Sequence, residues 1–304
     1  MTKTIVITGS SDGIGAAAAR HLNEAGHRVV VIGRSPRKTA EVARSIGADH
    51  FVADFARLDD VRRLAGDLTS AYPRIDVLAN NAGGVFGDPA RTVDGFEKTF
   101  QINHLAPFLL TTLLMDTLLE SSATVIQTSS VGGEQVRSFD PTDLNLDKNF
   151  SPVRAYGAAK LENILFTMEL HRRYHHRGLS TAAFHPGNVA TNFGSETTSK
   201  LMRFLATNRV TRSMLISPEK GASQLVWLAT TTPGTEWRSG DYYTNRKPKT
   251  ARCATPDNAV ALWGESERLL SLTRGSCDTS VPHPPQLSCG DAPIPGANGD
   301  SRDA

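Results

Sequence analysis

The sequence predicts an α/β protein whose mainly parallel sheet is doubly wound, with helices on both faces. Short, almost wholly apolar and β-branched segments alternate with longer stretches whose apolar residues recur at helical spacing. Strands without polar alternation are typical of a parallel sheet that is buried on both faces. No repeat or linker interrupts this alternation up to residue 245. We therefore expect a single domain over residues 1–274, built by right-handed crossovers.

The expected elements follow in order along the chain. Strands are predicted at residues 4–8, 28–32, 50–53, 76–80, 124–128, 181–185 and, more weakly, 241–244. Helices are predicted at residues 14–25, 38–45, 59–71, 93–119, 154–177, 218–229 and 256–272.

Composition and charge exclude several classes of protein. The chain has 304 residues and a net charge of +2, and its dispersed basic residues give no reason to expect a nucleic-acid partner. The longest apolar block, 108–115, is interrupted by two threonines, so no membrane span is predicted. The start lacks the apolar run of a signal peptide, and we expect a cytoplasmic protein. His171 and His175 have metal-ligand spacing, but no further ligand is near, so no metal is expected.

A glycine-rich loop follows the first expected strand and opens into an Ala-rich helix. Gly9 suits a tight turn, Gly13 a close backbone approach to a pyrophosphate, and Gly15 close packing of helix on strand. The helix start adds N–H groups for an anion. The spacing differs from G-x-G-x-x-G, and a plain turn is the alternative. We predict a Rossmann fold whose cofactor-binding residues here are Gly9, Ser11, Asp12, Gly13, Ile14 and Gly15.

Residues after the second and third strands are expected to bind the adenosine half of a dinucleotide. Arg34 stands where a carboxylate would bind a 2′-hydroxyl, and a guanidinium suits a 2′-phosphate. NADP(H) is therefore expected, with NAD(H) as the alternative. Asp54, with its neighbour Phe55, is placed to accept from the adenine amino group; its other possible role is to cap the next helix.

Tyr156 and Lys160 lie four residues apart in a helical pattern, so that they share one helix face. A nearby ammonium favours the phenolate and lowers the pKa of a tyrosine, which suits an acid/base. Taken alone the pair is a weak signal, and two surface side chains are the alternative.

Together these motifs resemble the short-chain dehydrogenase/reductase family over about residues 3–245. The resemblance comprises the glycine-rich loop, Asp54, Asn80-Asn81-Ala82-Gly83, Asn103, Thr128-Ser129-Ser130, Tyr156, Lys160 and His185-Pro186-Gly187. The long interval between Ser130 and Tyr156, which contains Asp143-Leu144-Asn145, is similar to the retinol-dehydrogenase-like branch.

The resemblance implies a role for each residue of the catalytic set. Ser130 would bind the substrate oxygen and Tyr156 would transfer the proton. Lys160 would hold the nicotinamide ribose and lower the pKa of Tyr156, and Asn103 would fix a relay water. Ser129 competes for the serine role, but alternation along a strand points it the other way.

The resemblance also implies further cofactor contacts, and Tyr156 and Lys160 count among the cofactor-binding residues as well as the catalytic ones. Asn81 would lie beside the adenosine half of the cofactor; its other possible role is to stabilise the core of the sheet. Val189 and Thr191 would contact the nicotinamide carboxamide, or else form an ordinary turn. Many NADP-using members carry a basic residue where this chain has Asp12, so the preference for NADP rests on Arg34 alone.

Two segments outside the regular alternation complete the expectations. A long loop at about 188–217 is predicted to be a substrate lid. Its apolar side chains favour a largely apolar substrate; they are Phe193, Leu201, Met202, Phe204, Leu205, Met214 and Leu215. Residues 275–304 are rich in Pro, Gly, Ser and Asp, which predicts a disordered tail.

The function expected from these features is an NAD(P)-dependent oxidoreductase. It would transfer a hydride between nicotinamide C4 and an alcohol or carbonyl carbon of a largely apolar small molecule. The sequence leaves open whether it does so as a homo-oligomer. One alternative is a nucleotide-sugar epimerase or dehydratase, which would need a longer carboxy-terminal substrate domain. Another is a non-catalytic NADP(H)-sensing protein, against which the set Asn103, Ser130, Tyr156 and Lys160 argues.

Overall fold

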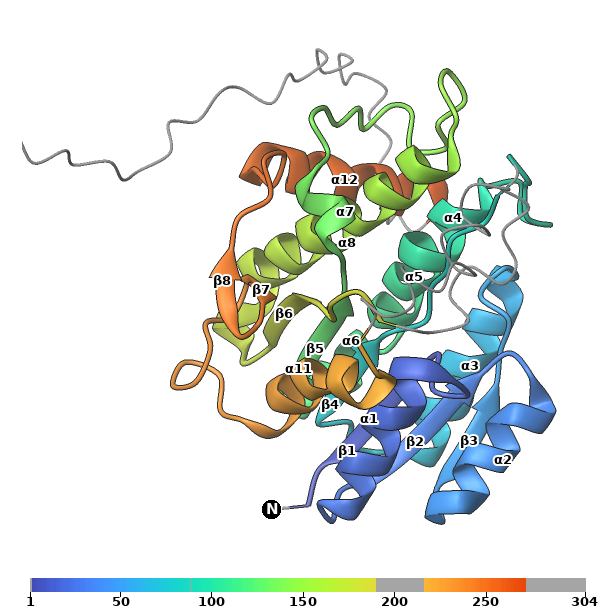
Figure 1. The fold of residues 1–304 in the computed structure, drawn as a ribbon, viewed down its shortest axis with the longest axis vertical. Coiled ribbons are helices and arrows are strands. Elements are labelled where there is room, and N and C mark those ends of the chain that lie inside the picture. Colours follow the sequence, from blue (N-terminus) through green and yellow to red (C-terminus); the bar gives the residue numbers. More distant parts are fainter. Residues whose placement is uncertain (1, 88, 190–215, 272–304) are drawn as a thin grey trace, which may run out of the picture.

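An eight-stranded sheet in the order β3-β2-β1-β4-β5-β6-β7-β8 forms the centre of the protein (Figure 1). The computed structural model describes residues 2–87, 89–189 and 216–271, and the structural statements below concern these residues. All pairs are parallel except β7 with β8. The predicted doubly wound, mainly parallel fold is confirmed.

The strands lie close to their predicted positions. They are β1 (Thr4–Thr8), β2 (Arg28–Gly33), β3 (Asp49–Val52), β4 (Val77–Asn80), β5 (Thr124–Thr128), β6 (Ser180–His185), β7 (Tyr242–Thr244) and β8 (Lys247–Lys249). The sequence did not predict β8, an exposed edge strand that reads Lys-Pro-Lys.

Helices form a layer on each face of the sheet. Helices α1 (Gly13–Glu24), α2 (Pro36–Ile46) and α11 (Pro218–Thr230) share one apolar core with the sheet. The other core contains α3 (Leu58–Ala71), α5 (Ala106–Leu113), α6 (Met115–Glu120), α8 (Pro152–Tyr174) and α12 (Pro256–Leu269). The short elements are α4 (Lys98–Phe100), η1 (Gln101–Leu105), α7 (Val131–Glu134) and η2 (His175–Arg177).

The same local signal starts several of these helices. In α2, α8, α11 and α12 a Ser or Thr is the N-cap and a Pro occupies the first helical position. The cap hydroxyl accepts from the amide three residues on, and a proline there loses no helical hydrogen bond. Ser-Pro and Thr-Pro pairs in the sequence therefore mark these helix starts.

The prediction of one continuous helix at 93–119 is wrong in detail. The structure has four consecutive elements there: α4, η1, α5 and α6. The first of them starts later than predicted, where both carboxylate oxygens of Glu97 accept amides of the first turn. Element η1 is a π-helix, in which the amide of Ala106 donates to the carbonyl of Gln101. Pro107 has no amide to donate to the carbonyl of Asn103, so the ladder can widen there.

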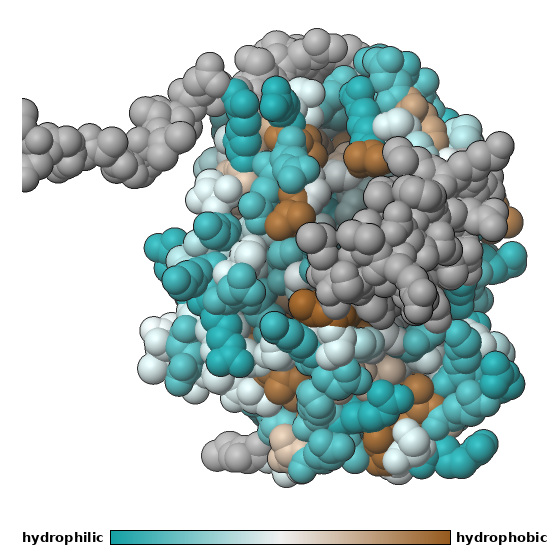
Figure 2. Space-filling model, in the orientation of Figure 1, coloured by the Kyte–Doolittle hydropathy of each residue, from teal (hydrophilic) through white to brown (hydrophobic). Residues whose placement is uncertain are grey.

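The coloured part of the face shown in Figure 2 gives few signs of an apolar contact area. Figure 2 shows a face on which most of the coloured side chains are hydrophilic and the apolar ones lie scattered. Single exposed apolar residues are normal on a folded protein. Within the described ranges, no helix is both long and apolar enough to cross a membrane.

Candidate active site

The residues of the predicted catalytic set come from separate elements and meet at the carboxyl ends of β4 and β5. Ser130 follows β5, Tyr156 and Lys160 lie in the first turns of α8, and Asn103 lies in η1. Ligands bind at this edge in open α/β sheets. The fold thus places the set where a ligand is expected.

Ser130 and Tyr156 are joined by a hydrogen bond between their side chains. Ser130 is also the N-cap of α7, and its Oγ accepts the amide of Gly132 at 3.2 Å. A Cβ added at Gly132 would lie 3.4 Å from Cε1 of Tyr156, so the short helix lies against the phenol ring. The two hydroxyls can therefore both form hydrogen bonds to one substrate oxygen.

Lys160 is 2% exposed, and its Nζ donates to the carbonyl of Thr128 at 3.0 Å. The same Nζ lies 5.7 Å from the centroid of the Tyr156 ring. Burial lowers the pKa of Lys160 to about 7. Burial also raises the pKa of Tyr156 to about 12, although the Ser130 hydrogen bond opposes this rise. The expected lowering of the Tyr156 pKa is therefore wrong for this state, in which burial dominates.

Asn103 is held by main-chain partners in the widened turn. Its Nδ2 donates to the carbonyls of Gly84 and Thr99 at 3.0 and 2.8 Å, and its Oδ1 accepts the amide of Gly84 at 3.2 Å. A Cβ at Gly83 would lie 2.4 Å from Oδ1 of Asn103 and 3.2 Å from Nζ of Lys160. Glycine at this position thus allows Asn103 and Lys160 to approach the same backbone.

Ser129 points away from Tyr156, as the alternation predicts. Its hydroxyl is buried and donates to the carbonyl of Lys160 at 2.6 Å. A Cβ at Gly133 would lie 2.8 Å from the amide nitrogen of Leu161, so α7 touches the backbone of α8 (Figure 1). These contacts fix the loop that carries Ser130.

The glycine-rich loop packs tightly on neighbouring strands. Gly9 has φ +65°, and a Cβ there would lie 2.7 Å from Cα of Ala82. A Cβ at Gly15 would lie 2.4 Å from the carbonyl of Gly9 and 2.7 Å from Nδ2 of Asn81. That Nδ2 donates to the carbonyl of Thr8 at 3.0 Å. Asn81 thus ties the loop to β4, which is the structural role considered for it.

Arg34 directly follows β2, and a second cation, Lys38, lies nearby in α2. Nζ of Lys38 lies 3.0 Å from Oδ2 of Asp12, whose other oxygen accepts the amide of Gly13 at 2.8 Å. Lys38 therefore neutralises the Asp12 carboxylate, whose negative charge is unfavourable for binding a 2′-phosphate. The sequence analysis missed this residue, although its position one turn after Arg34 in a predicted helix was a usable signal.

Of the remaining predicted cofactor residues, some lie in local turns or in the core, some lie beside the glycine-rich loop, and one lies outside the described residues. Asp54 accepts the amide of Ala56 at 3.0 Å in a local turn, and the Phe55 side chain is 5% exposed, within the core. A Cβ at Gly221 would lie 2.6 Å from Val189 and 3.2 Å from Ile14, so the structure brings these two residues together. Ser11 lies against Gly33 at the end of β2. Thr191, the main part of the proposed lid and the tail lie outside the described residues.

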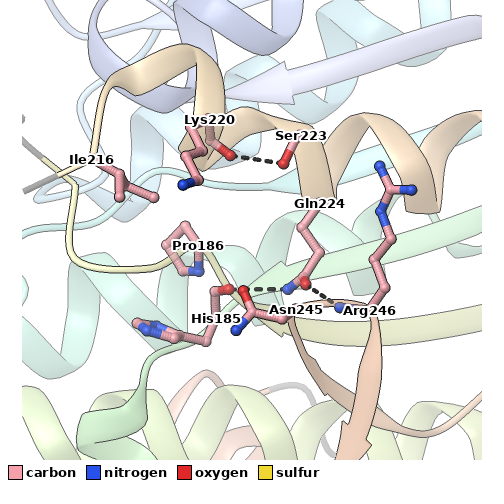
Figure 3. A pocket seen from close by; sticks show the side chains of 8 residues that line it. All are labelled: His185, Pro186, Ile216, Lys220, Ser223, Gln224, Asn245 and Arg246. Atoms are coloured by element: carbon pink, nitrogen blue, oxygen red, sulfur yellow. Dashed lines mark hydrogen bonds between the residues drawn. The ribbon is translucent and has the colours of Figure 1, made fainter.

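A separate cavity of about 180 Å³ lies between α11 and the ends of β6 and β7 (Figure 3). It is lined by His185, Pro186, Ile216, Lys220, Ser223, Gln224, Asn245 and Arg246, none of which belongs to the catalytic set. In Figure 3 the His185 ring points away from the other lining side chains. Within the described ranges, no group of three or more His, Cys, Asp or Glu could hold a metal ion.

Two carboxyl groups, Glu97 and Glu162, are buried where α4 meets α8. Glu97 caps α4 through both oxygens, whereas Oε2 of Glu162 has no hydrogen-bond partner. Burial, and then the charge of Glu97, raise the pKa of Glu162 well above its ordinary value. Glu162 is therefore protonated in the folded protein at pH values where it ionises in the unfolded chain.

Glu162→Gln should remove a pH-dependent loss of stability. Between the ordinary pKa near 4.5 and the raised pKa, the folded state holds a proton that the unfolded state has lost. The free energy of unfolding of the unmodified protein therefore falls as pH rises through this window. Denaturant unfolding at pH 4 and pH 8 should show the variant gaining stability relative to the parent only at the higher pH. Parallel profiles, or an equal change in the exposed control Glu120→Gln, would contradict this.

The fold and the site together define a class: an oxidoreductase that uses a nicotinamide dinucleotide. The family described as short chain dehydrogenase matches residues 3–201. The chain belongs to the short-chain dehydrogenase/reductase family and resembles its retinol-dehydrogenase-like branch.

Individual relatives agree with this assignment. A Streptomyces sp. (strain C5) protein, provisionally named daunorubicin C-13 ketoreductase DnrU, is 43% identical over 87% of this chain and 91% of its own length. Mouse retinol dehydrogenase 14 (Mus musculus) is 34% identical over 90% of this chain and 87% of its own length. These names support oxidation or reduction at an alcohol or carbonyl carbon.

Solved structures show the same fold. A protein from Mycobacterium paratuberculosis has a TM-score of 0.70 and 32% identity, covering 88% of this chain and 93% of that one. A short chain dehydrogenase from Shigella flexneri 2a, solved in complex with NADP, has a TM-score of 0.62 and 26% identity, covering 79% and 95%.

Proposed function

We propose that the protein is an NADP(H)-preferring oxidoreductase in which Tyr156 is the general acid/base for an alcohol or carbonyl substrate. The observation that carries this is the convergence of Ser130, Tyr156, Lys160 and Asn103 at the strand ends. The retinol dehydrogenase and ketoreductase names among the relatives favour the same chemistry.

The residues present fit an NADP(H) molecule. First-turn amides of α1 have no acceptor within the helix and suit a pyrophosphate. Arg34 and Lys38 would bind the 2′-phosphate, with Asp12 neutralised by Lys38. Lys160 would donate to the nicotinamide ribose, and Ile14 and Val189 would flank the nicotinamide end. When bound, the reduced nicotinamide supplies the hydride.

The chain itself supplies the proton and the orientation. A phenol with a pKa of about 12 is protonated at neutral pH, which is the form that donates to the oxygen of a carbonyl under reduction. Ser130, hydrogen-bonded to that phenol, would orient the same oxygen. Asn103, held rigidly by main-chain bonds beside Lys160, would fix the water that returns the proton to Lys160.

The direct test of this proposal is NADPH oxidation measured across a panel of apolar aldehydes and ketones. Turnover of at least one class of carbonyl compound, and its loss when Tyr156 is altered, are the expected results. If no compound of the panel supports NADPH oxidation by this protein, the proposal is contradicted.

The preference for NADP is tested separately through Arg34. Arg34→Asp should weaken NADPH binding by about 2 to 3 kcal/mol, because a charge-assisted contact is lost and a repulsive charge is added. Arg37→Asp, at an exposed position of α2, is the matched control and should change the affinity little. Titration of NADPH and NADH by fluorescence gives the dissociation constants. Equal binding of both cofactors by the unmodified protein would overturn the preference.

A further inference from the structure

Glu134 lies one helical turn beyond Ser130. Ser130 is the N-cap of α7 and Glu134 is its last residue, so the two lie at the opposite ends of one short helical turn. Ser130 is hydrogen-bonded to Tyr156, so Glu134 closes the short helix whose N-cap contacts the proposed acid/base.

Two hydroxyls of β7 orient the Glu134 carboxylate. Tyr242 Oη donates to Oε1 at 2.8 Å, and Thr244 Oγ1 donates to the same oxygen at 3.3 Å. Tyr242 is 2% exposed, and its phenol is close enough to Tyr156 to feel its charge. The carboxylate is thus held by strand β7 rather than left as a free surface group.

Both hydrogen bonds of Glu134 among the described residues go to Oε1, which leaves the second carboxylate oxygen, Oε2, without a donor from this part of the chain. An ionised carboxylate can accept about four hydrogen bonds, so this half-buried group has acceptor capacity left. The charge of Glu134 also acts on His185, whose buried Nδ1 has no hydrogen-bond partner among the described residues. Oε2 is not among the buried atoms without a partner, so it is open to solvent, and a ligand hydroxyl can replace water as its donor.

We propose that Glu134 is a substrate-recognition residue that binds a hydroxyl group on a carbon next to the reacting carbonyl. A substrate that offers its carbonyl oxygen to Ser130 can then offer the neighbouring hydroxyl to Glu134, one turn away. The preferred substrates are α-hydroxy ketones, and in the reverse direction vicinal diols. This assignment rests on the proposed function, because Ser130 and Tyr156 must bind the carbonyl.

The test compares two ketones that differ only at one group: 2-hydroxyacetophenone and propiophenone, in which a methyl replaces the hydroxyl. With NADPH, the unmodified enzyme should prefer the hydroxy ketone in kcat/KM by about ten-fold or more, as expected of a site that hydrogen-bonds a substrate hydroxyl. Glu134→Ala should bring this ratio close to one, mainly through KM of the hydroxy ketone. Tyr242→Phe should lower the ratio part of the way, because Glu134 loses one of the hydroxyls that orient it.

Two further variants separate recognition from structure. Glu134→Gln retains one acceptor oxygen and should keep part of the preference even if Glu134→Ala folds poorly. Glu120→Ala, at an exposed position of α6, should leave the ratio unchanged. Equal use of both ketones by the unmodified enzyme, or an unchanged ratio in both Glu134 variants, overturns this proposal and leaves the proposed function intact. No NADPH oxidation with any carbonyl compound overturns both.

Discussion

Tyr156→Phe should lower turnover by about two to four orders of magnitude, the usual contribution of a positioned acid/base. The substitution removes only the hydroxyl that Ser130 contacts and leaves the ring against Gly132. Folding and NADPH affinity should therefore persist, because neither depends on the phenol oxygen. Steady-state NADPH oxidation measures the turnover, and NADPH titration measures the affinity.

Tyr174→Phe is the matched control, because Tyr174 ends the same helix and packs on Trp263 instead. It should leave turnover near that of the unmodified protein. Ser130→Ala should lower turnover without a large change in cofactor affinity, since its partner would be the substrate oxygen. Near-normal turnover in Tyr156→Phe would mean that another group carries the proton, and the proposed mechanism would fail.

Lys160→Met should reduce activity and increase stability at the same time. Activity should fall by an amount similar to that of Tyr156→Phe, and NADPH should bind more weakly, because the ammonium would serve both the phenol and the ribose. The buried Lys160 has its pKa lowered from 10.5 to about 7, which corresponds to at most about 5 kcal/mol of unfavourable burial. An unbranched apolar side chain of similar length removes this penalty.

The sign of the pH dependence distinguishes this effect from general repacking. Between about pH 7 and pH 10.5 the unfolded chain holds the Lys160 proton and the folded protein does not. The stability of the unmodified protein therefore rises with pH across this window. Lys160→Met should be clearly more stable than the parent at pH 6 and should lose this advantage near pH 10. An advantage independent of pH, or one also shown by the exposed control Lys249→Met, would contradict the assignment.

The fold could be predicted from the sequence because its signals are local. Apolar β-branched runs fixed the strands to within one or two residues, and Ser-Pro or Thr-Pro pairs marked four helix starts. The break at Glu97 was missed, since a carboxylate that caps two amides gives no sign in apolar periodicity. The π-turn was missed for a similar reason, although Pro107 was visible.

The residues of the candidate site could be predicted from the sequence, but their burial, their pKa values and their long-range contacts could not. The resemblance supplied Ser130, Asn103, Tyr156 and Lys160 as residues, whereas burial decides the pKa of Tyr156 and only the folded structure shows it. The contacts of Lys38 and Glu134 could not be predicted, because their partners come from distant parts of the chain. Asp12 reaches Lys38 across 26 residues, and Tyr242 reaches Glu134 across 108 residues. No short sequence window contains such pairs.

The edge strand β8 has a consequence for self-association. A sheet edge offers unpaired amides and carbonyls on which another chain can add a strand. Here the edge is occupied by Lys247, Pro248 and Lys249, which are exposed and pair antiparallel with the tyrosines and threonine of β7. Proline lacks a donor, and like-charged lysines repel a second copy. These residues therefore disfavour the addition of a strand from a second copy, and a chain that ends before β8 would present the aromatic edge of β7 to its neighbours.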